Sequence, residues 1–147
     1  KVWTRLFGSS EEDIAKAITI GSDGSLYITG ITGGDLDGQT NNGFNDAFIS
    51  KFNSDGTKDW TRLLGSSDYE NANGITTGSD GSLYITGMTE GDLDGQTFSG
   101  GYRFSDTFIS KFNSDGTRNW TSVLGSSENN SGNSIATDVN GSIYPSI

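Results

Sequence analysis

The sequence predicts an all-β fold built from repeated antiparallel sheets of four strands. Three observations predict it. A segment of the chain recurs at offsets of 57 and 60 residues, each copy contains four short apolar runs bounded by turn residues, and no stretch shows the 3.6-residue period of an amphipathic helix.

The repeat is close to identity over two stretches. Residues 21–40 (GSDGSLYITGITGGDLDGQT) and 78–97 (GSDGSLYITGMTEGDLDGQT) agree at 18 of 20 positions, and residues 46–67 and 106–127 agree at 17 of 22. The offset grows by three because residues are inserted between Gly100 and Asp106. Self-similarity of this kind indicates that each copy forms one structural unit.

The expected strands follow in chain order. A first strand is expected at Val2–Phe7, ahead of the first complete repeat. That repeat then supplies four runs rich in β-branched and aromatic residues, at Ala15–Ile20, Ser25–Ile31, Ala47–Phe52 and Lys58–Leu64. The second repeat follows the same plan and two further strands end the chain, which makes eleven strands in all.

The connections within a repeat are of two kinds. Residues 21–24 (GSDG) and 53–56 (NSDG) predict tight hairpin turns, because Gly supplies the positive φ that such turns need. The connection between the second and third strands is long, at residues 32–45 and 89–105. We expect these long loops to be the part of each repeat that is most free to carry function.

Four antiparallel strands with one long loop are typical of a β-propeller blade. Small residues in the first strand, such as Ala15 and Ala17, fit the crowding of innermost strands around an axis. Ile18, Ile75 and Ile135 are expected at one recurring buried position. The fourth strand opens with an aromatic in every copy (Trp3, Trp60 and Trp120), which favours packing between blades over a platform for ligands.

The blade count predicts an incomplete ring. Residues 1–147 form one domain, with a fourth strand of a preceding blade in 1–10, blades at 11–67 and 68–127, and a partial blade at 128–147. About two and a half blades cannot close a ring of four to eight. Two main alternatives follow, a fragment of a longer propeller or a homo-oligomer in which copies complete one another's blades, with other β stacking as a third. Pro145 in the last strand removes a ladder donor.

The repeated sequence resembles a known family. The string DAFISKFNSDGTKDWTRLLGSS, a short acidic loop, and then NGITTGSDGSLYITG resemble the bacterial SBBP β-propeller repeat over nearly the whole chain. The resemblance implies a propeller in a secreted or cell-surface protein. It brings no catalytic residues with it.

Composition excludes several functional classes. The chain has 9 Lys plus Arg against 19 Asp plus Glu, a net charge of −10, and neither His nor Cys. Disulfides, thiolate zinc sites, cysteine nucleophiles and histidine-based catalysis are therefore excluded. The acidic balance disfavours nucleic acid and anionic membranes, and no apolar run is long enough for membrane insertion. Cations are the expected small partners.

The long loops contain the candidate metal site. Each carries two carboxylates at i and i+2, followed by Gly: Asp35 and Asp37 in the first copy, Asp92 and Asp94 in the second. Such a loop could curl around calcium, which takes six to eight oxygen ligands. An EF-hand does not fit, because the Gly stands at the wrong position and no helices flank the loop. The alternative is an Asp-Gly turn whose carboxylates cap backbone N–H groups.

The remaining acidic residues predict no catalytic pair. Those before the first strand of each repeat, such as Glu11, Glu12 and Glu70, are expected on a solvated face, with a cation site as the alternative. Asp46 and Asp106 are expected to hydrogen-bond to the neighbouring blade. Because the same acids recur in both repeats, we expect a non-enzymatic scaffold with calcium-stabilised loops, which binds a surface glycan or a protein. The alternative is a lectin-like propeller that stacks sugars on Phe44, Phe98, Tyr102 and Phe104.

Overall fold

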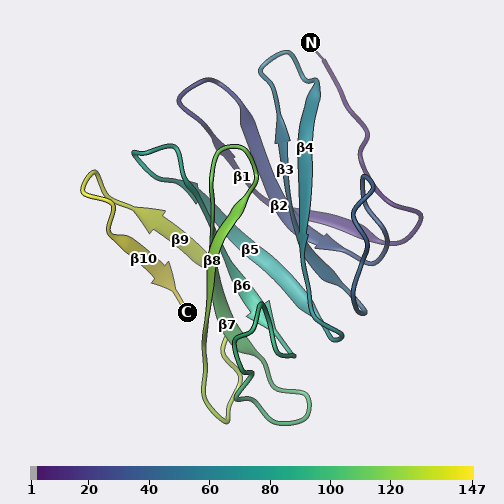
Figure 1. Ribbon diagram of the computed structural model, residues 1–147, viewed down its shortest axis with the longest axis vertical. Helices are drawn as coiled ribbons and strands as arrows, with labels where there is room; N and C mark the ends of the chain where they lie inside the picture. The colour runs from purple at the N-terminus through teal and green to yellow at the C-terminus, as the bar shows by residue number, and fades with distance from the viewer. Residues whose placement is uncertain (1–2) are drawn as a thin grey trace.

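The computed structural model describes residues 3–147 and is all-β, as predicted (Figure 1). Two sheets have four strands and one has two, in the orders β1-β2-β3-β4, β5-β6-β7-β8 and β10-β9. Every pairing between the ten strands of residues 3–147 is antiparallel. Residues 3–147 contain no helix, and thus no helix that could cross a membrane.

The strands lie where the repeat places them. The first sheet comprises β1 (Asp13–Ile20), β2 (Leu26–Thr32), β3 (Asp46–Phe52) and β4 (Lys58–Leu64). The second comprises β5 (Glu70–Thr77), β6 (Leu83–Thr89), β7 (Asp106–Phe112) and β8 (Arg118–Leu124), and the third comprises β9 (Ser134–Thr137) and β10 (Ile143–Ser146). Matching registers place Ile18 opposite Ile28 and Ile75 opposite Ile85.

Each sheet has two apolar faces, because alternate residues of a strand point to opposite sides. We call one the Ile face: it carries Leu26, Ile28, Phe48 and Phe52 in the first sheet and Leu83, Ile85, Phe108 and Phe112 in the second. We call the other the Tyr face: it carries Tyr27, Ile49 and Trp60 in the first sheet and Tyr84, Ile109 and Trp120 in the second.

The sheets stack in one direction, Tyr face against Ile face. The main core joins Tyr27, Ile49 and Trp60 to Ile85 and Phe108 of the second sheet. A smaller core joins the Tyr face of the second sheet to the third sheet: Tyr84 and Ile109 pack with Ile135 and Ile143. The second sheet is thus covered on both sides, and the first and third sheets lie at the two ends (Figure 1). Stacked four-stranded sheets of this kind form a partial β-propeller.

The N-terminal segment, residues 3–10, corrects the expectation of a strand there. Residues 3–147 contain ten strands and none of these lies within residues 3–10, whereas eleven strands were expected; Lys1 and Val2 fall outside the described residues. The reason is that residues 3–147 offer this segment no third strand of its own blade to pair with. The segment packs instead on the Ile face of the first sheet, where Phe7 meets Phe48 and Phe52 edge to face at 5.8 and 5.7 Å between ring centroids.

One expectation of burial also fails. Ile75 and Ile135 are buried, at 9% and 8% exposure, but Ile18 at the same position is 59% exposed. The cause lies in the stacking, because the Ile face of each later sheet meets the sheet before it, whereas no sheet covers Ile18 in residues 3–147. The shared sequence position defines the direction of the side chain and not what covers it.

Candidate functional site

The long loops are built on a miniature hairpin. The backbones of Leu36 and Gln39 exchange two hydrogen bonds of 3.0 Å, and Asp37 and Gly38 between them have φ of 57° and 75°. Two positive φ values in succession define a type I′ turn, for which Asp-Gly is a preferred pair. The second loop repeats this at residues 93–96, and Leu36 and Leu93 are both buried beneath it. The predicted Asp-Gly turn is therefore present in both repeats.

The two carboxylates of each loop have different partners. Asp35 Oδ1 accepts the N–H of Asn41 at 2.9 Å, whereas Asp37 pairs with Lys58 at the start of β4. In the second loop Asp92 accepts the N–H of Phe98 at 2.8 Å, and Asp94 pairs with Arg118.

The ion pair affects the protonation of Asp37. Burial acts to raise the pKa of Asp37, but the hydrogen bonds from Lys58 and Thr61 and the charge of Lys58 outweigh it and leave this pKa below its usual value. Each acid therefore acts as a local hydrogen-bond acceptor. Across residues 3–147, no three acidic side chains converge as a ready metal cluster. Calcium binding by Asp35, Asp37, Asp92 and Asp94 stays a prediction.

Buried carboxyl groups lie beside these loops. Asp46 and Asp106, at the starts of β3 and β7, are fully buried, and each accepts an N–H from the long loop of its own repeat. The prediction that Asp46 and Asp106 hydrogen-bond to the neighbouring blade was therefore wrong. Oδ1 of each has no hydrogen-bond partner and faces the glycine that follows the fourth strand. Burial raises the pKa of Asp46 although hydrogen bonds from Asn42 and Gly43 oppose it.

Glu70 is an exception to the expected solvated acidic loop, because Glu11 and Glu12 in the first copy of that loop are exposed whereas Glu70 is buried. It opens β5 and is 1% exposed, accepting hydrogen bonds from the backbone and hydroxyl of Ser66 and from Thr89. Burial raises the pKa of its carboxyl group, and the nearby Asp46 charge adds to the rise. The sequence signal was available, since Glu70 aligns with Asp13, whose carboxylate accepts the same bonds from Ser9.

An aromatic cleft lies among the loops at the junction of the first two sheets. Phe44 and Tyr69 stack with ring centroids 4.8 Å apart and 8° between their planes, and both are exposed. Tyr102 also lines the cleft and is exposed, and the guanidinium of Arg103 lies 5.2 Å from the centre of its ring. Asp68, Glu90 and Phe98 complete the lining of a cleft of about 450 Å³.

Backbone hydrogen bonds hold the stacked pair in place across the first two sheets. The N–H of Phe44 donates to Asp68 O at 3.0 Å, the N–H of Glu70 to Asn45 O at 2.8 Å, and the N–H of Glu90 to Tyr69 O at 3.0 Å. The platform is therefore part of the junction between the sheets, and it is not a free loop tip. Such preorganisation reduces the entropy that a ligand must remove on binding.

The cleft occurs at one junction. Its platform position Tyr69 is replaced by Asn129 in the next copy, where the amide oxygen of Asn129 accepts the N–H of Ser105 instead. Of the aromatic residues singled out from the sequence, Phe44, Phe98 and Tyr102 line the cleft and Phe104 does not. Tyr69 and Arg103 were missed. The variation at position 69 within the short acidic loop was the signal that could have found Tyr69.

Comparison with known proteins shows what the blades are. Residues 59–94 match the family model described as the SBBP beta-propeller repeat. The chain carries an SBBP repeat. The matched residues begin in β4, run through β5 and β6, and end at the Asp94 turn, so the SBBP unit spans the junction between the first and second sheets. The SBBP resemblance inferred from the sequence is confirmed over residues 59–94.

A relative extends the similarity along the chain. Regulatory protein FlaEY of Caulobacter vibrioides is 30% identical to this chain over 156 residues. The alignment covers 96% of this chain and 16% of FlaEY, so the chain corresponds to a small part of that protein.

Proposed function

We propose that the chain is a non-enzymatic binding scaffold, a run of propeller blades in a secreted or cell-surface protein that presents a ligand cleft at its loop edge. The observation that carries the proposal is the Phe44–Tyr69 platform, held between two sheets and open to solvent. The similarity to a protein named as regulatory fits a binding role. The absence of catalysis is part of the proposal, and the local hydrogen bonds of the acidic side chains support it.

The chemistry of the cleft favours a carbohydrate as the ligand, which is the second candidate. A flat pair of aromatic rings offers an apolar face to the C–H side of a sugar ring, and the carboxylates of Asp68 and Glu90 can accept its hydroxyl hydrogens. Arg103 adds hydrogen-bond donors to the lining of the cleft. A volume of about 450 Å³ is within the range of small-molecule sites.

A glycan array tests this proposal directly. We expect labelled wild-type protein to bind a subset of glycans, and Phe44→Ala and Tyr69→Ala each to weaken that binding at least about tenfold by removing stacking worth about 1.4 kcal/mol. Val139→Ala is the control, since Val139 is as exposed and lies outside the cleft. Binding that survives both aromatic substitutions would contradict the proposal that the ligand binds in this cleft. An array without hits would remove the carbohydrate candidate.

Calcium stabilisation of the long loops is a separate part of the proposal. A calcium ion shared by Asp35 and Asp37 would have to compete with Lys58 for the second carboxylate. If it binds, wild-type protein melts at a higher temperature in calcium than in chelator. The variant with all four aspartates (Asp35, Asp37, Asp92 and Asp94) changed to Asn melts at the same temperature in both. Equal melting temperatures for wild-type protein in the two buffers would refute calcium binding.

A further inference from the structure

The two end faces of the stack are the two halves of the junction that the chain already uses twice. At each internal junction a Tyr face meets an Ile face. The first sheet presents an Ile face outward and the third sheet a Tyr face, so each end offers what the other end lacks. We propose that a second copy of this chain docks head to tail, with its third sheet against the Ile face of the first sheet.

Equivalent residues of the repeats show how much cover the Ile face of the first sheet lacks. Ile18 is 59% exposed, whereas its equivalents Ile75 and Ile135 are 9% and 8% exposed at the internal junctions. Ile28, on the neighbouring strand, is half-buried, whereas its equivalent Ile85 is fully buried. Equivalent side chains are therefore buried where a Tyr face covers them and more exposed to solvent where none does.

The third sheet shows the complementary deficit. Tyr144 in β10 is 58% exposed, whereas Tyr27 and Tyr84, which occupy the same position in β2 and β6, are 3% and 5% exposed. Both buried tyrosines are covered by the Ile face of the next sheet. Tyr144 is therefore placed to pack against Ile18 of a second copy, as Tyr27 packs against the face of the second sheet that carries Ile75.

The N-terminal segment, residues 3–10, lies on the outward Ile face of the first sheet where part of a further sheet would pack. Trp3 and Arg5 reproduce the contacts that Trp60 and Arg62 of β4 make with the second sheet: Arg5 Nε donates to Gly56 O at 2.9 Å, as Arg62 Nε donates to Gly116 O at 3.1 Å. The ring of Trp3 lies over Gly56, as the ring of Trp60 lies over the equivalent Gly116. The segment thus occupies the position of a fourth strand belonging to a preceding sheet.

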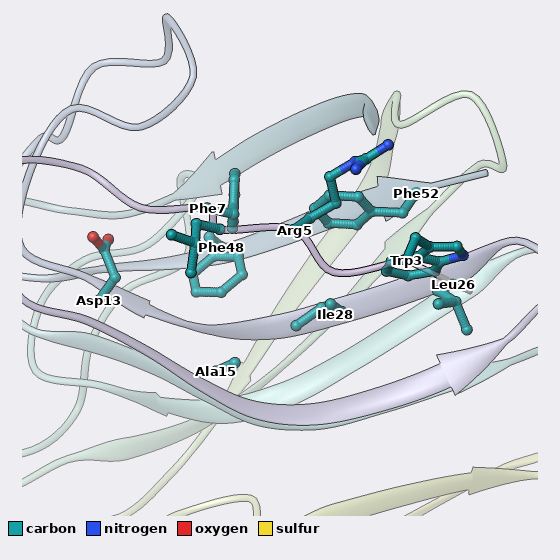
Figure 2. A pocket seen from close by; sticks show the side chains of 10 residues that line it. Trp3, Arg5, Phe7, Asp13, Ala15, Leu26, Ile28, Phe48 and Phe52 are labelled. Carbon is teal, nitrogen blue, oxygen red and sulfur yellow. The ribbon is translucent and has the colours of Figure 1, made fainter. Parts of the chain in front are cut away.

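The rest of that position is open. The segment covers the outer half of the Ile face and leaves a cleft of about 310 Å³ beside it, lined by Ala15, Leu26 and Ile28 on the first sheet and by Leu6 of the segment. Figure 2 shows Trp3, Arg5 and Phe7 along one side of this cleft, above the strands that carry Ile28 and Ala15. The open part of the Ile face lies over β1 and β2, the two inner strands of the first sheet. The third sheet consists of β9 and β10, which are the corresponding inner strands of a blade.

The occupant we assign is therefore the third sheet of a second copy. At the first internal junction β5 packs across β1, β2 and β3. By the same geometry β1 of one copy would lie across β9 and β10 of the other, beside the segment and not in conflict with it. The contact is heterologous, and such contacts form closed rings when the rotation allows. Two copies of three sheets give six, within the range of four to eight blades that closes.

Solution mass tests the proposal. We expect wild-type protein to have twice the mass of one chain by light scattering, and Ile18→Asp and Tyr144→Asp each to halve it. Both side chains are exposed in the single chain, so neither substitution disturbs a packed core, and circular dichroism should be unchanged. Tyr102→Asp adds the same charge at an exposed site on the loop edge and should leave the mass doubled.

Mixing the two variants tests the head-to-tail arrangement itself. The Ile18→Asp copy keeps an intact third sheet and the Tyr144→Asp copy keeps an intact Ile face, so an equimolar mixture should recover the doubled mass through one intact junction. Three results would overturn the proposal: a wild-type mass of a single chain at every accessible concentration, doubled masses in both single variants, or no recovery on mixing. The first of these would indicate instead that a blade elsewhere in one polypeptide covers these faces.

Discussion

Asp46 is a carboxyl group that the fold buries without a full set of donors. Its Oδ2 accepts the N–H of Asn42 at 3.1 Å, but its Oδ1 has no partner. Because burial raises its pKa in the folded state, folding favours the protonated form. The ionised form then costs stability above the folded pKa, and this cost disappears as pH falls to the ordinary carboxyl pKa of about 4.

We therefore expect Asp46→Asn to unfold at a higher urea concentration than wild-type protein at pH 7. The two midpoints should converge as pH is lowered toward about 4, where wild-type Asp46 is protonated in both states. Urea titrations across this pH range measure the difference. A variant less stable than wild type at pH 7 would mean that the Asp46 charge contributes favourable interactions and that burial does not dominate.

Asp23 provides a control of opposite sign. It is exposed, and hydrogen bonds from the backbone and hydroxyl of Ser25 lower its pKa. Its contribution to stability is present above the ordinary carboxyl pKa and is lost as pH falls through the lowered value. Asp23→Asn should therefore be slightly less stable than wild type at pH 7, opposite to Asp46→Asn.

At the scale of the element, the hairpin turn between β7 and β8 contacts the neighbouring sheet as well as closing its own. Gly116 has a φ of 83°, and a Cβ at this position would lie 2.8 Å from the Trp60 ring of the first sheet. The glycine is thus needed for two reasons, the left-handed backbone and the close approach of Trp60. Gly81, in the turn between β5 and β6, has a φ of 79° and no atom within 4 Å of a Cβ.

These two glycines separate backbone strain from the contact between sheets. Gly81→Ala should cost about 1–2 kcal/mol, the strain of a side chain in the left-handed region. Gly116→Ala should cost that amount and about 1–3 kcal/mol more, because the Trp60 ring must move. Equilibrium unfolding in urea gives both values. Equal losses for the two variants would show that Trp60 is not held on the turn.

The elements were largely predictable from the sequence, and their surroundings were not. The turns and the strand bounds follow from local chemistry, as in β4, which spans the predicted Lys58–Leu64. The exposure of Ile18 and the lack of a strand at Trp3–Phe7 depend on which sheet lies next to them, and no local pattern carries that information. The cleft was half predictable for the same reason: Phe44 and Tyr102 were named, but Tyr69 joins them through the junction between sheets.

At the scale of the whole molecule, each sheet is stabilised by its neighbours, as in repeat proteins. The second sheet is covered on both faces, and its strands β6 and β7 are buried along almost their whole length. The third sheet has two strands of four residues, one covered face and an open edge at β10, where Pro145 donates no hydrogen bond. Local opening should therefore be easiest in the third sheet.

Amide hydrogen exchange measures this order. In the Ile18→Asp variant, which we expect to be a single chain, exchange should be slowest in β6 and β7, intermediate in the first sheet and fastest in β9 and β10, since protection follows burial of the strand and its neighbours. In wild-type protein at high concentration, the docked copy should slow exchange in β9 and β10 relative to the variant. Uniform protection across the three sheets would contradict neighbour-by-neighbour stabilisation, because it would mean that the stack opens as a single cooperative unit.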